Sequence, residues 1–284
     1  MLNGAFAVGT PDCVSHLAEE IPQPRVNIPK AIAAQMVVGF ITSFIYLISI
    51  FYSISDFAGL LSNPYTFPLA ELYRQATGSH GGALGLLLVI FFPTVCCCIG
   101  TFITSGRTLW TLARDDATPF SGQLGRISGT WKNPFNATLA CGGVVTVMGC
   151  IYVGSTTAFN AFVGSYVVLS TLSYLAAILP HLLTQRRYVV PGPFWMPGWV
   201  VHAVLGISCV YIMMFIVIYC FPYSRPTTAQ NMNYSCAITG GLTVLVACWW
   251  LWKSGRGYVG PKALIEEENR LAAAHHGRIE KDRI

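Results

Sequence analysis

Residues 31–55 read AIAAQMVVGFITSFIYLISIFYSIS, a run that contains no Asp, Glu, Lys or Arg and lies between Lys30 and Asp56. A helix that crosses the hydrocarbon core of a bilayer needs about 20 consecutive and mainly apolar residues. The run therefore predicts a membrane-spanning helix.

The same pattern recurs along the chain. Further crossings are expected at residues 81–106, at two segments between 132 and 186 that separate near residues 152–156, at about 199–221 and at about 234–252. Residues 2–18 form a weaker segment, which is short and contains two glycines, a proline and Asp12. Counting it as a discontinuous span gives an all-α membrane protein of about seven transmembrane helices.

The composition excludes the ordinary soluble classes. Of the 284 residues, 54% are hydrophobic and 10% are charged, whereas a soluble globular domain carries about 25% charged residues. The mean hydropathy is +0.55. The formal net charge of +5 resides in short loops and in the tail, so we expect the lipid bilayer as a partner and no nucleic acid.

The basic residues predict the orientation of the chain. Counted by loop, one side collects almost all of them, namely Arg25, Lys30, Arg107, Arg114, Arg126, Lys132, Arg186, Arg187 and those of the tail from Lys253 onward. The other side holds only Arg74 and Arg225. Cytoplasmic loops carry the excess of Lys and Arg. We therefore expect residues 1–253 to form a transmembrane domain and residues 254–284 a cytoplasmic tail.

Two Asn-X-Ser/Thr sequences match the acceptor pattern for N-glycosylation. Asn136 lies on the side predicted to be cytoplasmic, which excludes modification there. Asn233 faces outward but directly precedes the last span, and its modification is therefore doubtful.

The first segment is the one most indicative of function. Gly4, Gly9, Pro11 and Asp12 are poorly suited to the interior of a lipid-facing helix. Broken helices persist in membranes where they line a protein cavity, and secondary transporters bind substrates and ions at such breaks. The alternative is that Asp12 caps an ordinary helix start.

Several stretches of the chain resemble the amino acid–polyamine–organocation (APC) permeases. Residues 9–31 (GTPDCVSHLAEEIPQPRVNIPKA) resemble the sixth helix and the loop after it, and residues 105–120 (SGRTLWTLARDDATPF) resemble the connection after the eighth helix. Residues 133–137 and 186–194 resemble the start of the ninth helix and the loop before the eleventh. The resemblance covers residues 1 to about 253 and is closest to fungal choline and GABA permeases.

The resemblance implies helices six to twelve of a LeuT-like carrier with twelve helices. These comprise the second of two inverted five-helix repeats and the last two helices, with the first helix of the chain discontinuous. The first repeat is missing, so we expect a truncated product or an incomplete gene model. The implied function is ion-coupled alternating-access transport of a small amino-containing solute: an amino acid, GABA, choline or a polyamine.

The resemblance also implies site residues. Phe6, Ala7, Val8 and Gly9 would form the unwound segment that faces the substrate. Asp12 would attract a cationic substrate or take part in proton coupling. Thr101, Thr104 and Ser105 lie where the related fold places a sodium site, and Asn160 and Ser165 are polar candidates facing the core. Hydroxyls in membrane helices often bond their own backbone instead, and the sequence does not distinguish sodium from a proton.

Three other functions remain as alternatives. The first is a seven-span receptor and the second is a membrane fragment that does not transport. The third, a membrane enzyme, is disfavoured because no His, Asp or Glu cluster with metal-ligand spacing and no paired nucleophile and base lie on facing spans. We expect a symporter of the plasma membrane with no enzymatic activity and no cofactor.

Overall fold

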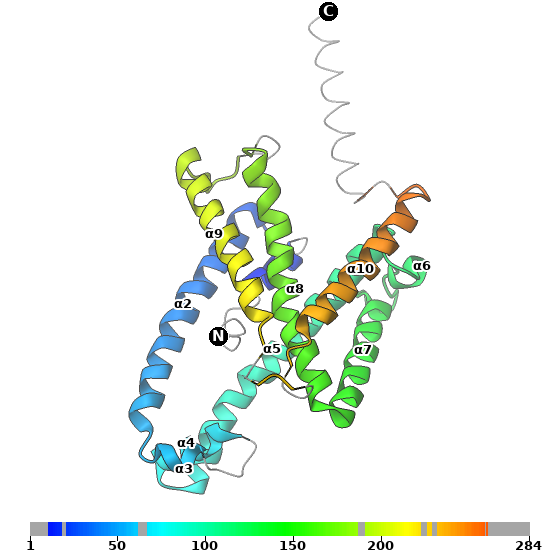
Figure 1. Ribbon diagram of the computed structural model, residues 1–284. Coiled ribbons are helices and arrows are strands. Elements are labelled where there is room, and N and C mark those ends of the chain that lie inside the picture. The colour runs from blue at the N-terminus through cyan, green and yellow to red at the C-terminus, as the bar shows by residue number, and fades with distance from the viewer. Residues whose placement is uncertain are drawn as a thin grey trace, which may run out of the picture. The chain divides into compact units, whose positions relative to one another are not determined.

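The computed structural model describes residues 11–18, 21–61, 67–186, 191–222, 226–228, 232–258 and 260. This described part of the chain contains helices and no strand. Its long helices are α2 (Pro24–Ser53), α5 (His80–Arg114), α7 (Phe135–Gly154), α8 (Thr156–Leu183), α9 (Gly198–Tyr219) and α10 (Ser235–Ser254) (Figure 1). Shorter elements are the 3-10 helix η1 (Pro11–Leu17) and the helices α3 (Phe57–Leu61), α4 (Pro68–Thr77) and α6 (Ser121–Leu124).

Within these described ranges, six helices are long and apolar enough to cross a membrane. They coincide with the six uninterrupted spans predicted from the sequence. The predicted first span falls on residues 2–18, of which only 11–18 are described, so its course through the bilayer stays a prediction. The part that is described, η1, is a 3-10 helix and not an α-helix.

Two spans extend beyond their charge-free runs. Helix α2 begins at Pro24 instead of near residue 31, with a proline in its first turn, where no backbone N–H partner is needed. Helix α5 continues past Gly106 to Arg114. Charged residues end a hydrophobic run but leave the backbone hydrogen bonds of a helix intact, which explains both differences.

The predicted break near residues 152–156 is confirmed. Helix α7 ends at Gly154 and α8 begins at Thr156, so that only Ser155 joins them. The extended backbone of Ser155 closes α7 through a hydrogen bond from its N–H to the carbonyl of Ile151. Its hydroxyl accepts a hydrogen bond from the N–H of Ala158 and caps α8, as serine does at helix starts.

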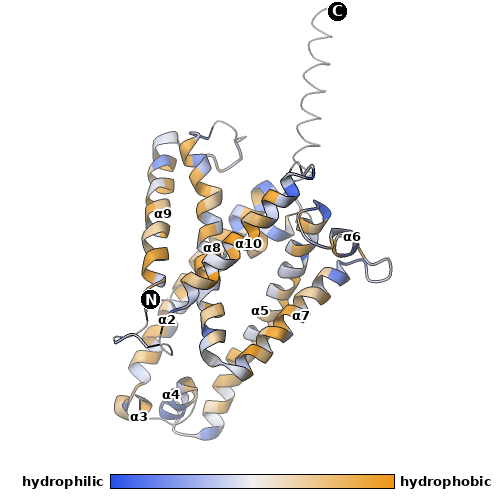
Figure 2. Ribbon diagram, turned by 45° about the vertical axis from the view of Figure 1, so that its right-hand side comes forward, coloured by the Kyte–Doolittle hydropathy of each residue, from blue (hydrophilic) through white to orange (hydrophobic). Residues whose placement is uncertain are grey.

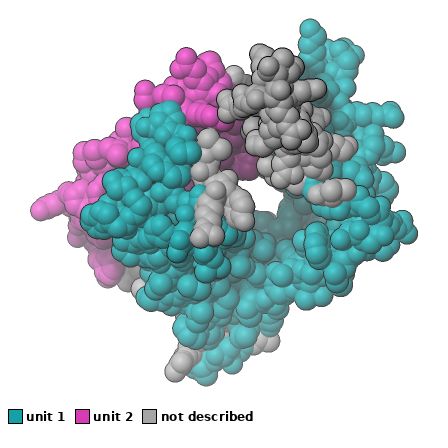
Figure 3. All heavy atoms as spheres, turned by 90° about the horizontal axis from the view of Figure 1, so that it is seen from above, with its two compact units in different colours: residues 1–9, 105–284 teal, residues 10–104 magenta. Residues whose placement is uncertain are grey.

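The chain divides into two compact units within α5 (Figure 3). In unit 2, residues 10–104, η1 and α4 both pack against α2. Its small core is formed by Leu72, Tyr73 and Ala83, against which Ile54 and Leu87 pack.

In unit 1, which contains residues 105–284, α8 packs against α9 and α10. Val168 and Cys209 are almost fully buried at this packing. Outside it, many apolar side chains of the spans are exposed, and the hydropathy colouring shows that apolar residues predominate along these helices (Figure 2). Such continuous apolar surfaces are expected for helices that face lipid.

Candidate functional site

Asp12 lies in η1, a run of seven residues. Runs of 3-10 helix longer than three or four residues are uncommon. The hydroxyl of Ser15 donates to the Asp12 carbonyl at 2.6 Å. The imidazole of His16 lies 3.3 Å from the Asp12 carboxylate, and both side chains are partly exposed. Asp12 is thus part of a carboxylate–imidazole pair that the sequence analysis did not identify, although the spacing of four residues could have indicated it.

The turn between η1 and α2 is defined by two local features. Gln23 adopts a left-handed conformation with φ 50° immediately before α2. The side-chain amide of Asn27, in the first turns of α2, donates to the carbonyl of Pro22 at 2.6 Å. These contacts fix the backbone at the start of α2, and η1 itself packs against α2.

The backbone segment Phe6, Ala7, Val8 and Gly9, predicted to face the substrate, lies outside the described residues. Its role therefore remains a prediction. Asp12, Thr101 and Thr104 belong to unit 2, whereas Ser105, Asn160 and Ser165 belong to unit 1.

The hydroxyls predicted to bind an ion are on α5. Thr101 donates to the carbonyl of Cys97 at 2.9 Å, and Thr104 donates to the carbonyl of Gly100 at 3.0 Å. Thr101 and Ser105 are exposed and Thr104 is partly buried. A threonine oxygen that donates its hydrogen to its own helix keeps lone pairs that can coordinate a cation, so these bonds are compatible with the predicted role.

The two polar candidates on α8 occupy different surroundings. Ser165 is 2% exposed, within the packing of α8 against its neighbours, and its hydroxyl donates to the carbonyl of Phe162 at 2.7 Å. Asn160 is exposed. At about 100° per residue, five residues along a helix turn the side chain well away from its starting direction. The two residues therefore lie on different faces of α8.

The motif at residues 105–120 comprises the end of α5 and a compact turn that follows it. The indole N–H of Trp110 donates to the carbonyl of Gly125 at 3.1 Å. Gly125 lies so close to α5 that an added Cβ would be 3.2 Å from the backbone nitrogen of Arg114. The ammonium of Lys253 binds the carboxylate of Asp116 at 2.9 Å and joins the end of α10 to the turn after α5. The sequence analysis did not identify this connection between residues far apart in the chain.

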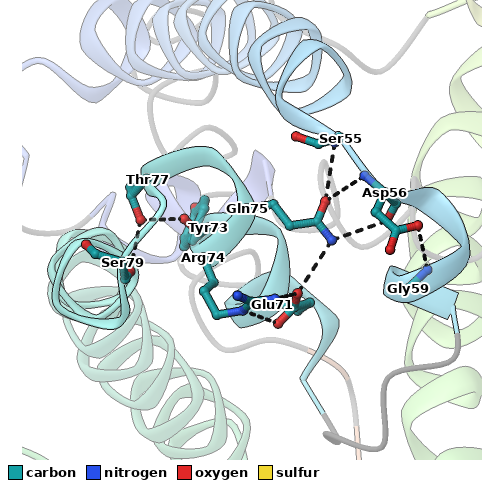
Figure 4. A network of polar contacts seen from close by, with 9 residues as sticks. All are labelled: Ser55, Asp56, Gly59, Glu71, Tyr73, Arg74, Gln75, Thr77 and Ser79. Atoms are coloured by element: carbon teal, nitrogen blue, oxygen red, sulfur yellow. Dashed lines mark hydrogen bonds and ion pairs between the residues drawn. The ribbon is translucent and has the colours of Figure 1, made fainter.

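A second polar network surrounds α4 in unit 2 (Figure 4). The side-chain amide of Gln75 accepts from the N–H of Ser55 and of Asp56 at 3.3 and 3.1 Å, and it donates to the Asp56 carbonyl at 3.2 Å. The Arg74 guanidinium donates to Glu71 at 2.8 Å and holds the pKa of that carboxyl below its ordinary value. Buried Tyr73 shares a hydrogen bond of 2.5 Å with Tyr46 of α2. These contacts fix α4 to the end of α2.

Comparison with known proteins identifies a family that matches the chain. The sequence model of a family described as amino acid permease matches residues 1–242. A choline transporter of Saccharomyces cerevisiae is 32% identical over 274 residues, which cover 96% of this chain and 47% of that protein. An uncharacterised amino-acid permease of Schizosaccharomyces pombe is 26% identical over 94% of this chain and 49% of its own length. An amino-acid permease of Arabidopsis thaliana is 24% identical, with 92% and 52% covered.

No solved structure matches the chain. The chain spans about half the length of the curated relatives it matches.

Proposed function

This chain belongs to the amino acid permease family, and we propose that it forms part of a secondary transporter for small amino-containing solutes. Choline, amino acids, GABA and polyamines are the candidate substrates. The observation that carries the proposal is the extent of the family match, which includes α2, α5, α7, α8 and α9 and enters α10. The similarity to a choline transporter over 96% of the chain makes choline the first substrate to test.

The proposed mechanism is alternating access coupled to a proton or to sodium. In carriers built from inverted repeats, one repeat moves against the other around a site near the middle of the bilayer. The present helices would supply the second repeat and the last two helices. The sequence that the relatives possess beyond the matched half would supply the first.

The proposed substrate site centres on the start of the chain. Phe6, Ala7, Val8 and Gly9 would offer backbone groups, and Asp12 would attract the ammonium group of the substrate or exchange a proton. The long 3-10 helix and the neighbouring imidazole of His16 support this role, because both are unusual features for a simple helix cap. Asn160 and Ser165 would contribute further polar contacts, and Thr101, Thr104 and Ser105 would bind the ion.

We further propose that the protein resides in the plasma membrane with its C-terminus in the cytoplasm. The asymmetry of the basic residues supports this orientation. Arg107, Arg114 and Lys253, which lie at or near the ends of α5 and α10, would then lie at the cytoplasmic surface.

Uptake of radiolabelled choline, GABA and amino acids by cells that express the complete gene tests the proposal. Expression should increase the uptake of at least one of these solutes above that of cells with an empty vector. The substitution Asp12→Asn should decrease this uptake about tenfold, equivalent to roughly 1.4 kcal/mol of binding or coupling. Asp56→Asn is the matched control, because Asp56 bonds the N–H of Gly59 in the connector after α2 and should not affect uptake.

Equal uptake with and without the gene for these three solutes and for a radiolabelled polyamine would contradict the transport function. Normal uptake by the Asp12→Asn variant across the pH range would instead restrict Asp12 to a structural role.

A further inference from the structure

A hollow of about 400 Å³ lies in unit 1 between the end of α5, the turn that follows it and the last turns of α10. Its walls include Leu112, Leu245, Val246, Trp249 and Trp250, and Tyr258 and Lys253 also line it. Binding sites for small molecules have volumes of about 300–1,000 Å³ and mainly apolar walls with a few polar groups. We call this space the α10 hollow. None of the residues proposed above for the solute or the ion lines it.

The hollow is held open by defined contacts between α10 and the turn. The indole N–H of Trp249 donates to the carbonyl of Ala117 at 2.7 Å. One turn further along α10, Lys253 binds Asp116 at 2.9 Å, and its side chain is 18% exposed. These bonds connect residues at both sides of the hollow and fix the distance between its walls.

Three lining residues carry a hydroxyl or an ammonium group, namely Thr118, Lys253 and Tyr258. Thr118 contributes a hydroxyl oxygen that is buried and has no hydrogen-bond partner among the described residues. Leaving a buried polar atom unpaired costs about 1–3 kcal/mol, so a ligand that accepts a hydrogen bond from this hydroxyl would be stabilised. Lys253 also lines the hollow, and Arg256, which is not a lining residue, follows between Lys253 and the lining residue Tyr258.

Charge and position together indicate the ligand. The guanidinium of Arg256 stacks on the ring of Trp252 at 3.9 Å and is exposed beyond the end of α10. Figure 2 shows α10 changing from apolar to polar at this end. Aromatic and basic residues gather at the level of the lipid headgroups, and anionic lipids attract basic residues at the cytoplasmic surface. The hollow thus combines an apolar cavity at membrane depth with cations at headgroup level.

We propose that the α10 hollow binds an anionic phospholipid, with one acyl chain between Val246 and Trp250 and the phosphate at Lys253 and Arg256. The Thr118 hydroxyl donates to a phosphate or ester oxygen of the same lipid. The choice of the anionic lipids of the inner leaflet rests on the proposed orientation of the chain. The binding itself is independent of transport.

Native mass spectrometry of the purified full chain tests the proposal. Samples in detergent are incubated with phosphatidylserine or phosphatidylcholine of the same acyl composition, and the retained lipid is counted. Phosphatidylserine should be retained in preference. Because anionic lipids attract basic residues, Arg256→Gln should weaken phosphatidylserine binding about fivefold. It should weaken phosphatidylcholine binding less, because the choline group of that lipid already offsets its phosphate charge.

Matched variants separate the hollow from general adhesion of lipid. Val246→Trp fills the hollow and should abolish retention, whereas Val244→Trp, on the same helix but outside the lining, should not. Arg126→Gln removes an exposed charge from the loop after α6 and is the control for Arg256→Gln. Thr118→Val should weaken binding without lowering the thermal stability of the lipid-free protein, because it removes a buried hydroxyl that has no partner there.

Three results would overturn the proposal. The first is equal retention of the two lipids, and the second is equal retention by Val246→Trp and Val244→Trp. The third is phosphatidylserine binding only after deletion of residues 261–284, which would identify the tail of the chain as the occupant of the hollow.

Discussion

Helices α2 and α8 are similar in length and apolarity but differ in what surrounds them. None of the residues of α2 is buried. Helix α8 buries Ala161, Ser165, Val167 and Val168. It does so because it packs against both α9 and α10. Among the described residues, the elements that pack most closely against α2 are the short η1 and α4.

The difference separates two causes of apolarity in a membrane protein. Residues on α2 such as Phe40, which is 70% exposed, are apolar although no described helix covers them, as expected for side chains that face lipid. Residues on α8 such as Val168 are apolar or small because another helix occupies the space. The hydropathy of a residue is the same whether it faces lipid or packs against another helix. Only the packing in the structure distinguishes the two cases.

The largest effect is expected from enlarging a small side chain on each helix. Ala161→Trp should lower the free energy of unfolding by about 3 kcal/mol, because overpacking a tight contact forces neighbouring groups apart. Ala161 is 5% exposed, and its carbonyl accepts a long hydrogen bond of 3.4 Å from the hydroxyl of Ser235 on α10. The measurement is thermal unfolding of the purified protein in mild detergent.

Ala34→Trp on α2 is the matched control and should leave the stability unchanged, because Ala34 is exposed. An equal loss for both variants would show that a protein surface also covers α2, and the comparison between the helices would fail.

The next effect concerns the link between α9 and α10. Asn233 is 2% exposed, and its side-chain amide donates to the carbonyls of Tyr219 and Phe221 at 2.6 and 3.1 Å. It also accepts from the N–H of Ser235 at 3.1 Å. Asn233→Ala leaves these groups unpaired and should cost about 2 kcal/mol, measured by the same unfolding assay.

Asn136→Ala is the control, since Asn136 makes one exposed hydrogen bond to the carbonyl of Gln123 and should cost less than about 1 kcal/mol. The buried amide of Asn233 also predicts that no glycan is attached there. A glycosidase-sensitive mass shift that disappears in the Asn233→Ala variant would disprove this assignment.

A smaller effect is expected where α4 meets α2. Tyr73→Phe removes the hydroxyl that bonds Tyr46 and should weaken the attachment of α4 by about 1 kcal/mol. Hydrogen exchange of residues 68–77 measures it. Tyr52→Phe, at a position on α2 that is 89% exposed, should cause no change. Equal exchange in the Tyr73→Phe variant and the parent would show that the apolar core alone fixes α4.

The smallest effect is a pH dependence of the same helix. Hydrogen bonds from Arg74 lower the pKa of Glu71 from its ordinary value of 4.5. Because the pKa is lower in the folded state, the ion pair stabilises α4 above pH 4.5, and this contribution is lost as the pH falls through the lowered value. Protection factors of residues 68–77 should decrease slightly below pH 4.5, and Glu71→Gln should remove this decrease. A protection factor independent of pH would contradict the ion pair.

The spans could be predicted because crossing a bilayer imposes a length and a composition that a single sequence displays. The break at Ser155 was also predictable, because small and polar residues interrupt a stretch too long for one crossing. The ends of α2 and α5 were not, since a helix continues into charged residues as long as its backbone bonds can form.

The contacts within the site were harder to predict. The pairs Lys253–Asp116 and Trp249–Ala117 join residues more than a hundred positions apart, and no local pattern indicates which acid or carbonyl a side chain reaches. The pairing of Asp12 with His16 was accessible, because residues four positions apart in a helical segment are neighbours. The roles of Phe6 to Gly9, Asn160 and Ser165 in binding remain predictions from the resemblance.

The junction between α7 and α8 has a mechanical consequence. Because Ser155 is the sole residue between the two helices, the connection cannot lengthen. Ser155 also takes part in the hydrogen bonds that end α7 and begin α8. If either helix shifts along the membrane normal, the other has to shift in the same direction. In the proposed transport cycle we therefore expect this hairpin to move as a single unit, and an epitope tag inserted at the junction to uncouple the two helices.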